Sequence, residues 1–277
     1  MTKHIGITQS LAVVFASLCL AQPASAAPGQ NVWSVGAEGF YDDYKESQGN
    51  VDDHTNYGSF TAGYTRDFGN YFFSANGRVS YGTDNYSSDT GSSSGAPQWE
   101  TEGRLRGGVT LHMNGGDTLS PYAGVGVRWF TDEGKDIVTT TGFTGYDRRI
   151  TQYYIPIGAT YTHSLRNSLG EGWTISPNLE VDPVPYGSVS SRLGSLGPPF
   201  ENVVNNQHSG FGVRSEVMLG EYTGAGFTWQ AGPFVRYWYF PDSDASACGA
   251  PFLPAGDCGI EPKNTRIQAG LAVRVLW

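Results

Sequence analysis

Hydrophobic and polar residues alternate along most of this chain with a period of two. The clearest example is the C-terminal segment 265–277. Only an extended strand places every second residue on one face. The apolar face of this segment consists of Ile267, Ala269, Leu271, Val273, Val275 and Trp277. The other face carries both arginines and consists of Arg266, Gln268, Gly270, Ala272 and Arg274. Such a strand separates hydrocarbon from water.

The same alternation recurs in further segments along the chain. They cover 33–41, 59–65, 71–81, 99–113, 119–129, 152–161, 173–182, 211–219 and 227–239. With the C-terminal segment they predict about ten strands, with eight or twelve as alternatives, and bacterial barrels have an even number. Each segment is long enough to cross a membrane at a tilt. We therefore expect an all-β fold, an antiparallel up-and-down transmembrane β-barrel.

The connectors between these segments are alternately short and long. The short ones are 67–70, 114–117, 167–170 and 221–224, and the long polar ones are 45–56, 83–97, 132–147, 183–207 and 241–263. Outer-membrane barrels have short periplasmic turns and longer outside loops. The pattern thus predicts that both ends of the barrel domain lie on the periplasmic side.

The N-terminal region has the features of a secretory signal peptide. Lys3 and His4 precede the short apolar run 11–20, and Ala24 and Ala26 form a small-x-small cleavage site. The run is too short to span a bilayer as a helix. We expect a signal peptide at 1–26 and one barrel domain at 27–277; a lipoprotein signal at Cys19 is the alternative.

The C-terminal strand resembles the last strand of Gram-negative outer-membrane β-barrels, which typically ends in an aromatic residue preceded by alternating apolar residues. The resemblance implies an outer-membrane location after secretion to the periplasm, with surrounding lipid and lipopolysaccharide. It also implies assembly by the barrel-assembly machinery, with a signal formed by Leu271, Val273, Val275 and Trp277. A soluble β-sandwich would alternate too, but its outer face would be rich in lysine, which these strands nearly lack.

Composition and charge narrow the choice further. The chain contains 38 Gly, 16 Tyr, 14 Phe and 7 Trp with 16% charged residues, as a glycine- and aromatic-rich β protein does. Its formal net charge of -9 argues against a nucleic-acid partner. Cys248 and Cys258 flank a Pro/Gly/Asp-rich stretch, and an oxidising compartment favours a disulfide between them over two free thiols.

The polar faces of the strands carry nearly balanced charges, and about ten strands leave little room beyond that filled by side chains. The first interpretation is a lumen plugged by arginine–carboxylate pairs. The alternative is a narrow pore whose arginines select small anions. The residues of this network are Glu38, Arg78, Glu100, Glu102, Arg104, Arg106, Arg128, Glu180, Asp182, Arg214, Glu216, Arg236, Arg266 and Arg274.

Three function classes follow. The leading one is a small porin-like protein, structural or passively conducting small solutes. The second is an adhesin or ligand-binding protein acting through outer loops with an acidic rim, comprising Asp42, Asp43, Glu46, Asp52, Asp53, Asp84, Asp89, Asp132, Glu133 and Asp136.

The third class is a hydrolase active at the outer rim. Asp52-Asp53-His54 superficially resembles the rim residues of omptin proteases, and His208-Ser209 suggests a lipid hydrolase. Adjacent residues of a strand point to opposite faces, so the second pair cannot form a nucleophile–base contact alone. With no metal-ligand spacing or cofactor fingerprint, we expect no catalytic residue, metal or cofactor.

Overall fold

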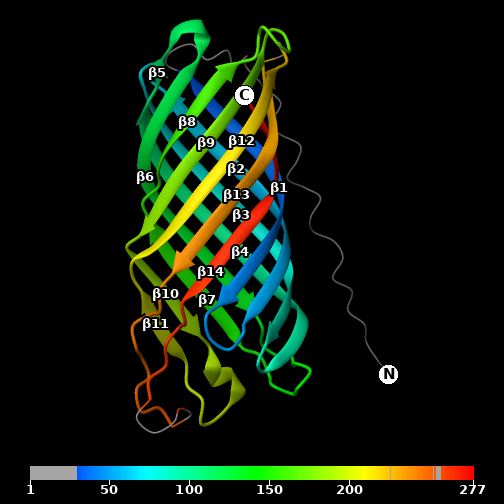
Figure 1. Ribbon diagram of the computed structural model, residues 1–277, viewed down its shortest axis with the longest axis vertical. Helices are drawn as coiled ribbons and strands as arrows, with labels where there is room; N and C mark the ends of the chain where they lie inside the picture. The colour runs from blue at the N-terminus through cyan, green and yellow to red at the C-terminus, as the bar shows by residue number, and fades with distance from the viewer. Residues whose placement is uncertain (1–29, 225, 252, 254–256) are drawn as a thin grey trace, which may run out of the picture.

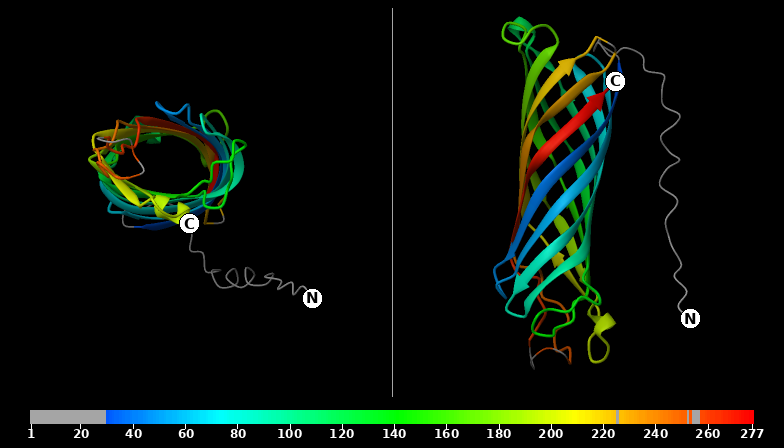
Figure 2. Two further views of the ribbon diagram at one scale, coloured as in Figure 1. Left: turned by 90° about the horizontal axis from the view of Figure 1, so that it is seen from below. Right: turned by 90° about the vertical axis from the view of Figure 1, so that its right-hand side faces the viewer.

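The computed structural model describes residues 30–277 except 225, 252 and 254–256, so the predicted signal peptide lies outside the described residues. The described chain forms an antiparallel sheet that closes on itself, and its ten wall strands surround an oval lumen (Figures 1 and 2). The predicted barrel and its number of strands are confirmed.

Some wall strands are interrupted, so that two consecutive elements together form one strand of the wall. These pairs of elements are β4 and β5, β7 and β8, β9 and β10, and β11 and β12. The elements are β1 (Asn31–Glu46), β2 (Asp52–Asp67), β3 (Tyr71–Ser88), β4 (Gly91–Val109), β5 (Leu111–His112), η1 (Asn114–Gly116), β6 (Thr118–Glu133), β7 (Asp147–Tyr154), β8 (Ile157–Ser164), β9 (Trp173–Val184), β10 (Tyr186–Ser191), η2 (Leu193–Leu196), β11 (Val203–Gln207), β12 (Gly210–Tyr222), β13 (Thr228–Phe240) and β14 (Asn264–Leu276).

The first and last strands pair with each other. β1 lies antiparallel to β14 from Ser34 opposite Leu276 to Glu46 opposite Asn264. Beyond this ladder, Trp33 and Trp277 exchange two backbone hydrogen bonds, of 2.8 and 3.0 Å. Closure leaves no open sheet edge in this part of the wall, and a lipid environment requires that every backbone polar group be paired.

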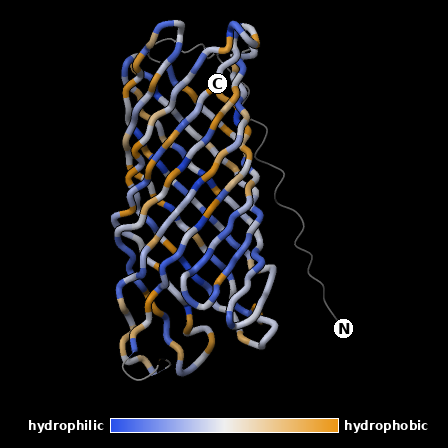
Figure 3. Tube along the Cα trace, viewed as in Figure 1, coloured by the Kyte–Doolittle hydropathy of each residue, from blue (hydrophilic) through white to orange (hydrophobic). Residues whose placement is uncertain are grey.

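Hydrophobic and hydrophilic residues alternate along the wall strands (Figure 3), and the outer face is apolar because the hydrophobic residues are the exposed ones. Exposed apolar side chains on β1, β3, β6, β9 and β14 include Val35, Val79, Val125, Leu179, Leu271, Val273 and Val275. Exposed aromatic side chains lie near the ends of this belt, as in membrane-interface girdles: Trp33, Tyr41, Tyr71, Tyr81, Trp99 and Trp129. No helix in the described part of the chain is long and apolar enough to cross a membrane.

The wall continues beyond this belt at the end opposite the C-terminus. The predicted outer loop 83–97 is wrong, because β3 extends to Ser88 and β4 begins at Gly91. The predicted loop 45–56 shrinks to 47–51, and 183–207 contains β10 and β11. The exposed residues of β3 and β4 there, such as Thr83, Asn85, Ser92 and Ser94, are polar, so the hydropathy alternation disappears although the backbone pairing continues.

The extension changes the position of the predicted acidic rim. Asp42, Asp53 and Asp84 are 2%, 7% and 5% exposed and face inward from β1, β2 and β3. They were predicted to lie on an exposed outer rim, and that prediction is wrong for these residues. The lumen, rather than the loops, contains much of the acidic charge.

Large aromatic side chains fill the lumen where the wall carries glycine. A Cβ atom on Gly212 would lie 2.7 Å from the Trp238 ring, and one on Gly126 would lie 2.2 Å from the Tyr154 ring. Both distances are far below a normal carbon–carbon contact. Glycine therefore lets these rings lie against the wall and pack across the lumen.

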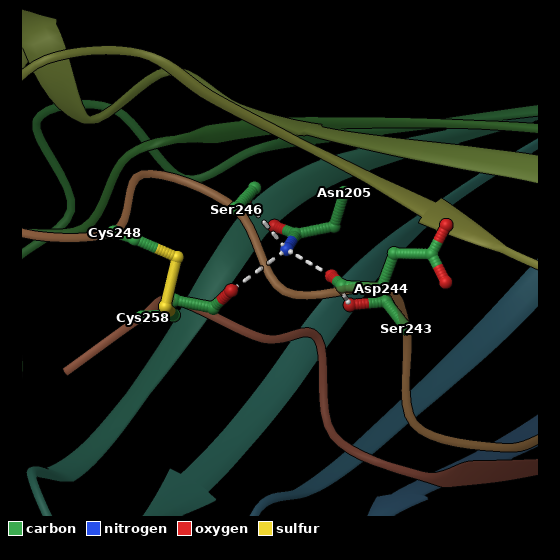
Figure 4. The surroundings of a disulfide bond; sticks show 7 residues. Asn205, Ser243, Asp244, Ser246, Cys248 and Cys258 are labelled. Atoms are coloured by element: carbon green, nitrogen blue, oxygen red, sulfur yellow. Dashed lines mark hydrogen bonds between the residues drawn. A yellow bond between two sulfur atoms is a disulfide. The ribbon is translucent and has the colours of Figure 1, made fainter.

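The long outer loop between β13 and β14 is tied in two ways. The disulfide between Cys248 and Cys258 joins its two arms (Figure 4). The Asn205 side-chain amide of β11 donates hydrogen bonds to the Asp244 and Gly259 carbonyls and to the Ser246 hydroxyl at 3.2, 3.1 and 2.8 Å. The loop is thus fixed to the neighbouring hairpin as well as to itself.

Candidate functional site: the charged lumen

The middle of the lumen is occupied by Trp238, which is fully buried. The guanidinium groups of Arg128 and Arg214 lie 5.0 and 4.9 Å from its ring, within cation–π distance. Tyr154 meets the same ring edge-on with 5.5 Å between ring centroids. These four side chains come from β6, β7, β12 and β13 and meet across the barrel axis.

Carboxylates from β4 connect these arginines to others. Arg128 binds Glu100 with two parallel hydrogen bonds of 3.0 and 2.9 Å, and Arg78 contacts the same carboxylate. Arg214 binds Glu102 with both terminal nitrogens and donates from Nε to Asp182 at 2.5 Å. Two-pronged pairing of this kind fixes geometry as well as charge.

A second set of pairs lies nearer the end of the barrel that holds the C-terminus of the chain, which is the C-terminal side of the lumen. Arg236 donates to both oxygens of Glu38 at 2.8 Å, and Arg274 pairs with Glu216 at 2.5 Å. Arg104 contacts Glu180, and Arg106 lies 3.9 Å from the same carboxylate. All of the predicted network residues therefore face inward, and each takes part in an ion pair, Arg266 doing so with Asp42 at 3.4 Å.

A cavity of about 120 Å³ adjoins this second set. Its lining includes Glu38, Arg104, Arg106, Glu216, Arg236 and Arg274. Arg106 and Arg274 are the more accessible cations there, with side chains 21% and 25% exposed. The cavity lies on the C-terminal side of Trp238, since Arg274 is opposite Gly36 near the start of β1.

The opposite half of the lumen, toward the polar wall extension, is acidic. Gln98 donates to Asp53 at 2.6 Å and accepts from the Thr55 and Tyr57 hydroxyls. Asp84 accepts the backbone N–H of Ala96 at 2.8 Å. Among the described residues, neither of these aspartates nor Asp132 of β6 has an ion-pair partner within 4.0 Å, as the complete set of pairs shows.

One further ion-pair group lies at the outer mouth. Arg148 contacts Glu261 and lies 3.2 Å from Glu46, and the Tyr44 hydroxyl donates to Glu46 at 2.7 Å. Burial raises the pKa of Glu261 above its usual value, and the nearby Arg148 opposes this shift. This group was not predicted from the sequence, because Arg148 and Glu261 fall in or beside predicted loops.

The aromatic part of the plug was likewise not predicted from the sequence. Its rings occur at inward positions, in phase with the arginines and glutamates: Phe40, Tyr57, Phe130, Tyr154, Phe234 and Trp238. That phase is the signal that could have identified them. Aromatic residues on the polar face of a predicted transmembrane strand indicate a filled lumen.

The predicted rim triplet 52–54 is split between the two faces of β2. Asp53 faces inward, whereas the His54 ring nitrogens lie 3.2 Å from Asp43 and 3.1 Å from Asp52 on the outer face. Lys45 pairs with both of these aspartates at 3.3 and 3.8 Å. His208 likewise lies 3.3 Å from Asp244. Neither arrangement brings a histidine to the inward aspartates.

Comparison with known proteins finds solved structures with a similar fold but no similar sequence. The sequence matches no protein-family model and no curated protein sequence. Among solved structures, it is similar to the outer membrane protease OmpT from Escherichia coli, with a TM-score of 0.53 and 11% identity over 90% of this chain and 97% of that chain. The translocator domain of the autotransporter NalP from Neisseria meningitidis gives a TM-score of 0.44 and 12% identity over 90% and 89%.

These similarities concern the fold alone. The Pseudomonas putida toluene transporter TodX also matches, with a TM-score of 0.31 and 10% identity over 90% of each chain. The chain is an outer-membrane β-barrel by fold, and the apolar belt places its wall in the lipid of that membrane. At this identity the neighbours' activities do not transfer.

Proposed function

We propose that this protein is a non-conducting outer-membrane barrel that serves as a rigid scaffold and carries a binding surface above the membrane. This is the structural form of the porin-like expectation. The proposal rests on one observation, the filled middle of the lumen. Trp238, Glu100 and Gln268 are 0% exposed there, and Tyr154 is 2% exposed.

The filled section opposes passive conduction. A water path would have to pass through side chains that are joined by two-pronged ion pairs, and breaking a buried pair costs about 3–5 kcal/mol. Gln268 extends the obstruction toward the outer side, because its amide nitrogen donates to both Asp42 and Glu100 at 2.7 and 2.8 Å. Solute passage therefore requires rearrangement of the plug rather than simple diffusion.

The binding role is supported by the outer end of the barrel. Wall strands continue beyond the aromatic girdle, and the loop 241–263 is held by the disulfide and by Asn205. Loops on a rigid support are common recognition surfaces. A hydrolase is the weaker alternative, since His54 faces away from the lumen aspartates; we propose that the protein is not an enzyme.

Assembly forms part of the proposal. Leu271, Val273 and Val275 are exposed on the outer face of β14. Trp277 ends the seam against β1. We propose that these residues form the signal that barrel-assembly machinery recognises.

Planar-bilayer conductance tests the plug. The wild-type protein is expected to be silent, and Trp238→Ala is expected to give openings because it removes the side chain that meets both central arginines. Trp129→Ala is the matched control, since Trp129 faces outward and is 44% exposed. Steady anion-selective current in the wild type, altered by Arg104→Ala with Arg106→Ala, would contradict the proposal and support a pore.

A further inference from the structure

The cavity on the C-terminal side of the plug is bordered by more cations than their carboxylate partners can match. Arg128 pairs with Glu100, Arg78 with Glu102, and Arg214 with Asp182. The remaining pairs in a one-to-one assignment are Arg104 with Glu180, Arg236 with Glu38, and Arg274 with Glu216. Arg106 is left over.

The environment of Arg106 agrees with this assignment. Within the described part of the chain, its nearest carboxylate is Glu180, at 3.9 Å, which Arg104 already contacts more closely. Arg214 also lies 3.4 Å from the same carboxylate. The other contacts of Arg106 are with neutral groups: a 2.8 Å hydrogen bond to Asn76, and the Tyr122 ring, whose centroid lies 4.9 Å from the guanidinium carbon.

An arginine in this position cannot relieve the imbalance by losing its proton, because the guanidinium stays charged in proteins. A largely buried charge that must share its only carboxylate with two other arginines is unfavourable. Several donor groups nearby are also buried without an acceptor among the described residues, namely Arg78 Nη1, Arg104 Nε, Arg106 Nε and Arg236 Nη1. The site therefore has both surplus positive charge and unused hydrogen-bond donors.

We propose that this cavity binds one small inorganic anion, of the size and charge of phosphate, with Arg106 as its principal partner. The volume of about 120 Å³ is several times the roughly 10–15 Å³ that one water molecule needs on the same measure, so one small oxyanion fits together with part of its hydration. Arg104 and Arg274 line the same cavity and carry accessible guanidinium groups. The anion reaches the cavity from the C-terminal, periplasmic side, because the plug closes the other side.

The test uses the folded full-length barrel in detergent and sodium phosphate as the probe. Ionic strength is kept constant with gluconate, a six-carbon anion much larger than phosphate. The thermal unfolding midpoint of the wild type is expected to rise by about 3–6 °C at a phosphate concentration roughly ten times the dissociation constant. Labelled phosphate should bind with one equivalent per barrel in equilibrium dialysis.

Arg106→Gln should lose both the midpoint shift and the bound phosphate, and its midpoint in gluconate should equal or exceed that of the wild type. Arg166→Gln is the matched control, because Arg166 is 71% exposed and pairs only with the exposed Glu171; it should keep the wild-type response. If Arg106→Gln does not fold, Arg104→Gln replaces it, since Arg106 can then pair with Glu180.

Two results would overturn the proposal. One is a wild-type barrel whose midpoint and dialysis show no phosphate binding. The other is an equal phosphate response in the wild type and in the folded arginine variant. Either result is independent of the conductance experiment, which tests the plug.

Discussion

The two halves of the lumen use the same types of charged residue in opposite proportions. Toward the outer mouth, Arg148 and Arg266 face six acids, which are Asp42, Glu46, Asp53, Asp84, Asp132 and Glu261. On the C-terminal side of the plug, the arginines exceed their assigned carboxylates. An excess of acid can be relieved by taking up protons, whereas an excess of arginine cannot. The two halves therefore differ in how they tolerate unpaired charge.

The largest change in unfolding free energy is expected when a carboxylate is removed from the arginine-rich half. Glu180→Gln would leave Arg104, Arg106 and Arg214 around a neutral amide. We expect a loss of about 3–5 kcal/mol in unfolding free energy, measured by urea unfolding in lipid vesicles. Glu171→Gln, in the exposed pair with Arg166, serves as the control and should change stability by less than about 1 kcal/mol. Equal effects of the two variants would remove the basis for the comparison.

Removal of a carboxylate from the acidic half should instead raise the unfolding free energy. Asp132 Oδ1 is buried without a hydrogen-bond partner among the described residues. Asp132→Asn removes a charge from an acidic cluster, so we expect a gain of about 0–1 kcal/mol at pH 8. The same urea titration measures it. A loss comparable to that of Glu180→Gln would mean that the acidic half is as tightly matched as the other.

Proton uptake by the acidic half should be visible at Glu261. Because its folded-state pKa is raised, the folded state holds this proton more tightly than the unfolded chain. Wild-type stability relative to Glu261→Gln should therefore decrease as pH rises from the unfolded value of about 4.3 through the raised folded value. Unfolding midpoints of both proteins between pH 4 and 9 measure the difference. A flat difference would show that Arg148 cancels the burial effect.

The smallest effect is expected at the short turn before β6, where the pH dependence has the opposite sign. Hydrogen bonds from Tyr161 and His163 lower the pKa of Asp117, which is partly exposed. Its contribution to stability is present above the unfolded pKa of about 3.9 and is lost as pH falls through the lower folded value. Asp117→Asn should thus differ slightly from the wild type at pH 6 and converge with it in strong acid. Divergence on acidification would contradict the assignment.

The sequence predicted the membrane-embedded part of this molecule well because two solvents act on it. Lipid outside and charge inside impose a period of two, and residues such as Leu271 and Arg274 follow it. Above the girdle both faces meet water or polar groups, so 83–97 was assigned as a loop although it pairs as strand. Backbone pairing alone leaves no hydropathy signal there.

The partners within the lumen could not be predicted from the sequence. Alternation places Glu100 and Arg128 on the inner face, but strand register and side-chain length decide that they meet. Gln98 and Gln268 carry no charge signal, yet each is almost fully buried and connects several polar groups. The role of Trp238 likewise depends on Gly212 opposite it on β12.

The seam between β1 and β14 constrains the order of events during biogenesis. Its two sides, β1 and β14, lie far apart in the sequence. Until these two strands pair, the sheet keeps two open edges, and such edges favour pairing with other chains. Removal of Trp277 and the residues just before it would shorten the ladder that closes the barrel, so proteolytic trimming there should affect assembly more than trimming in an outer loop.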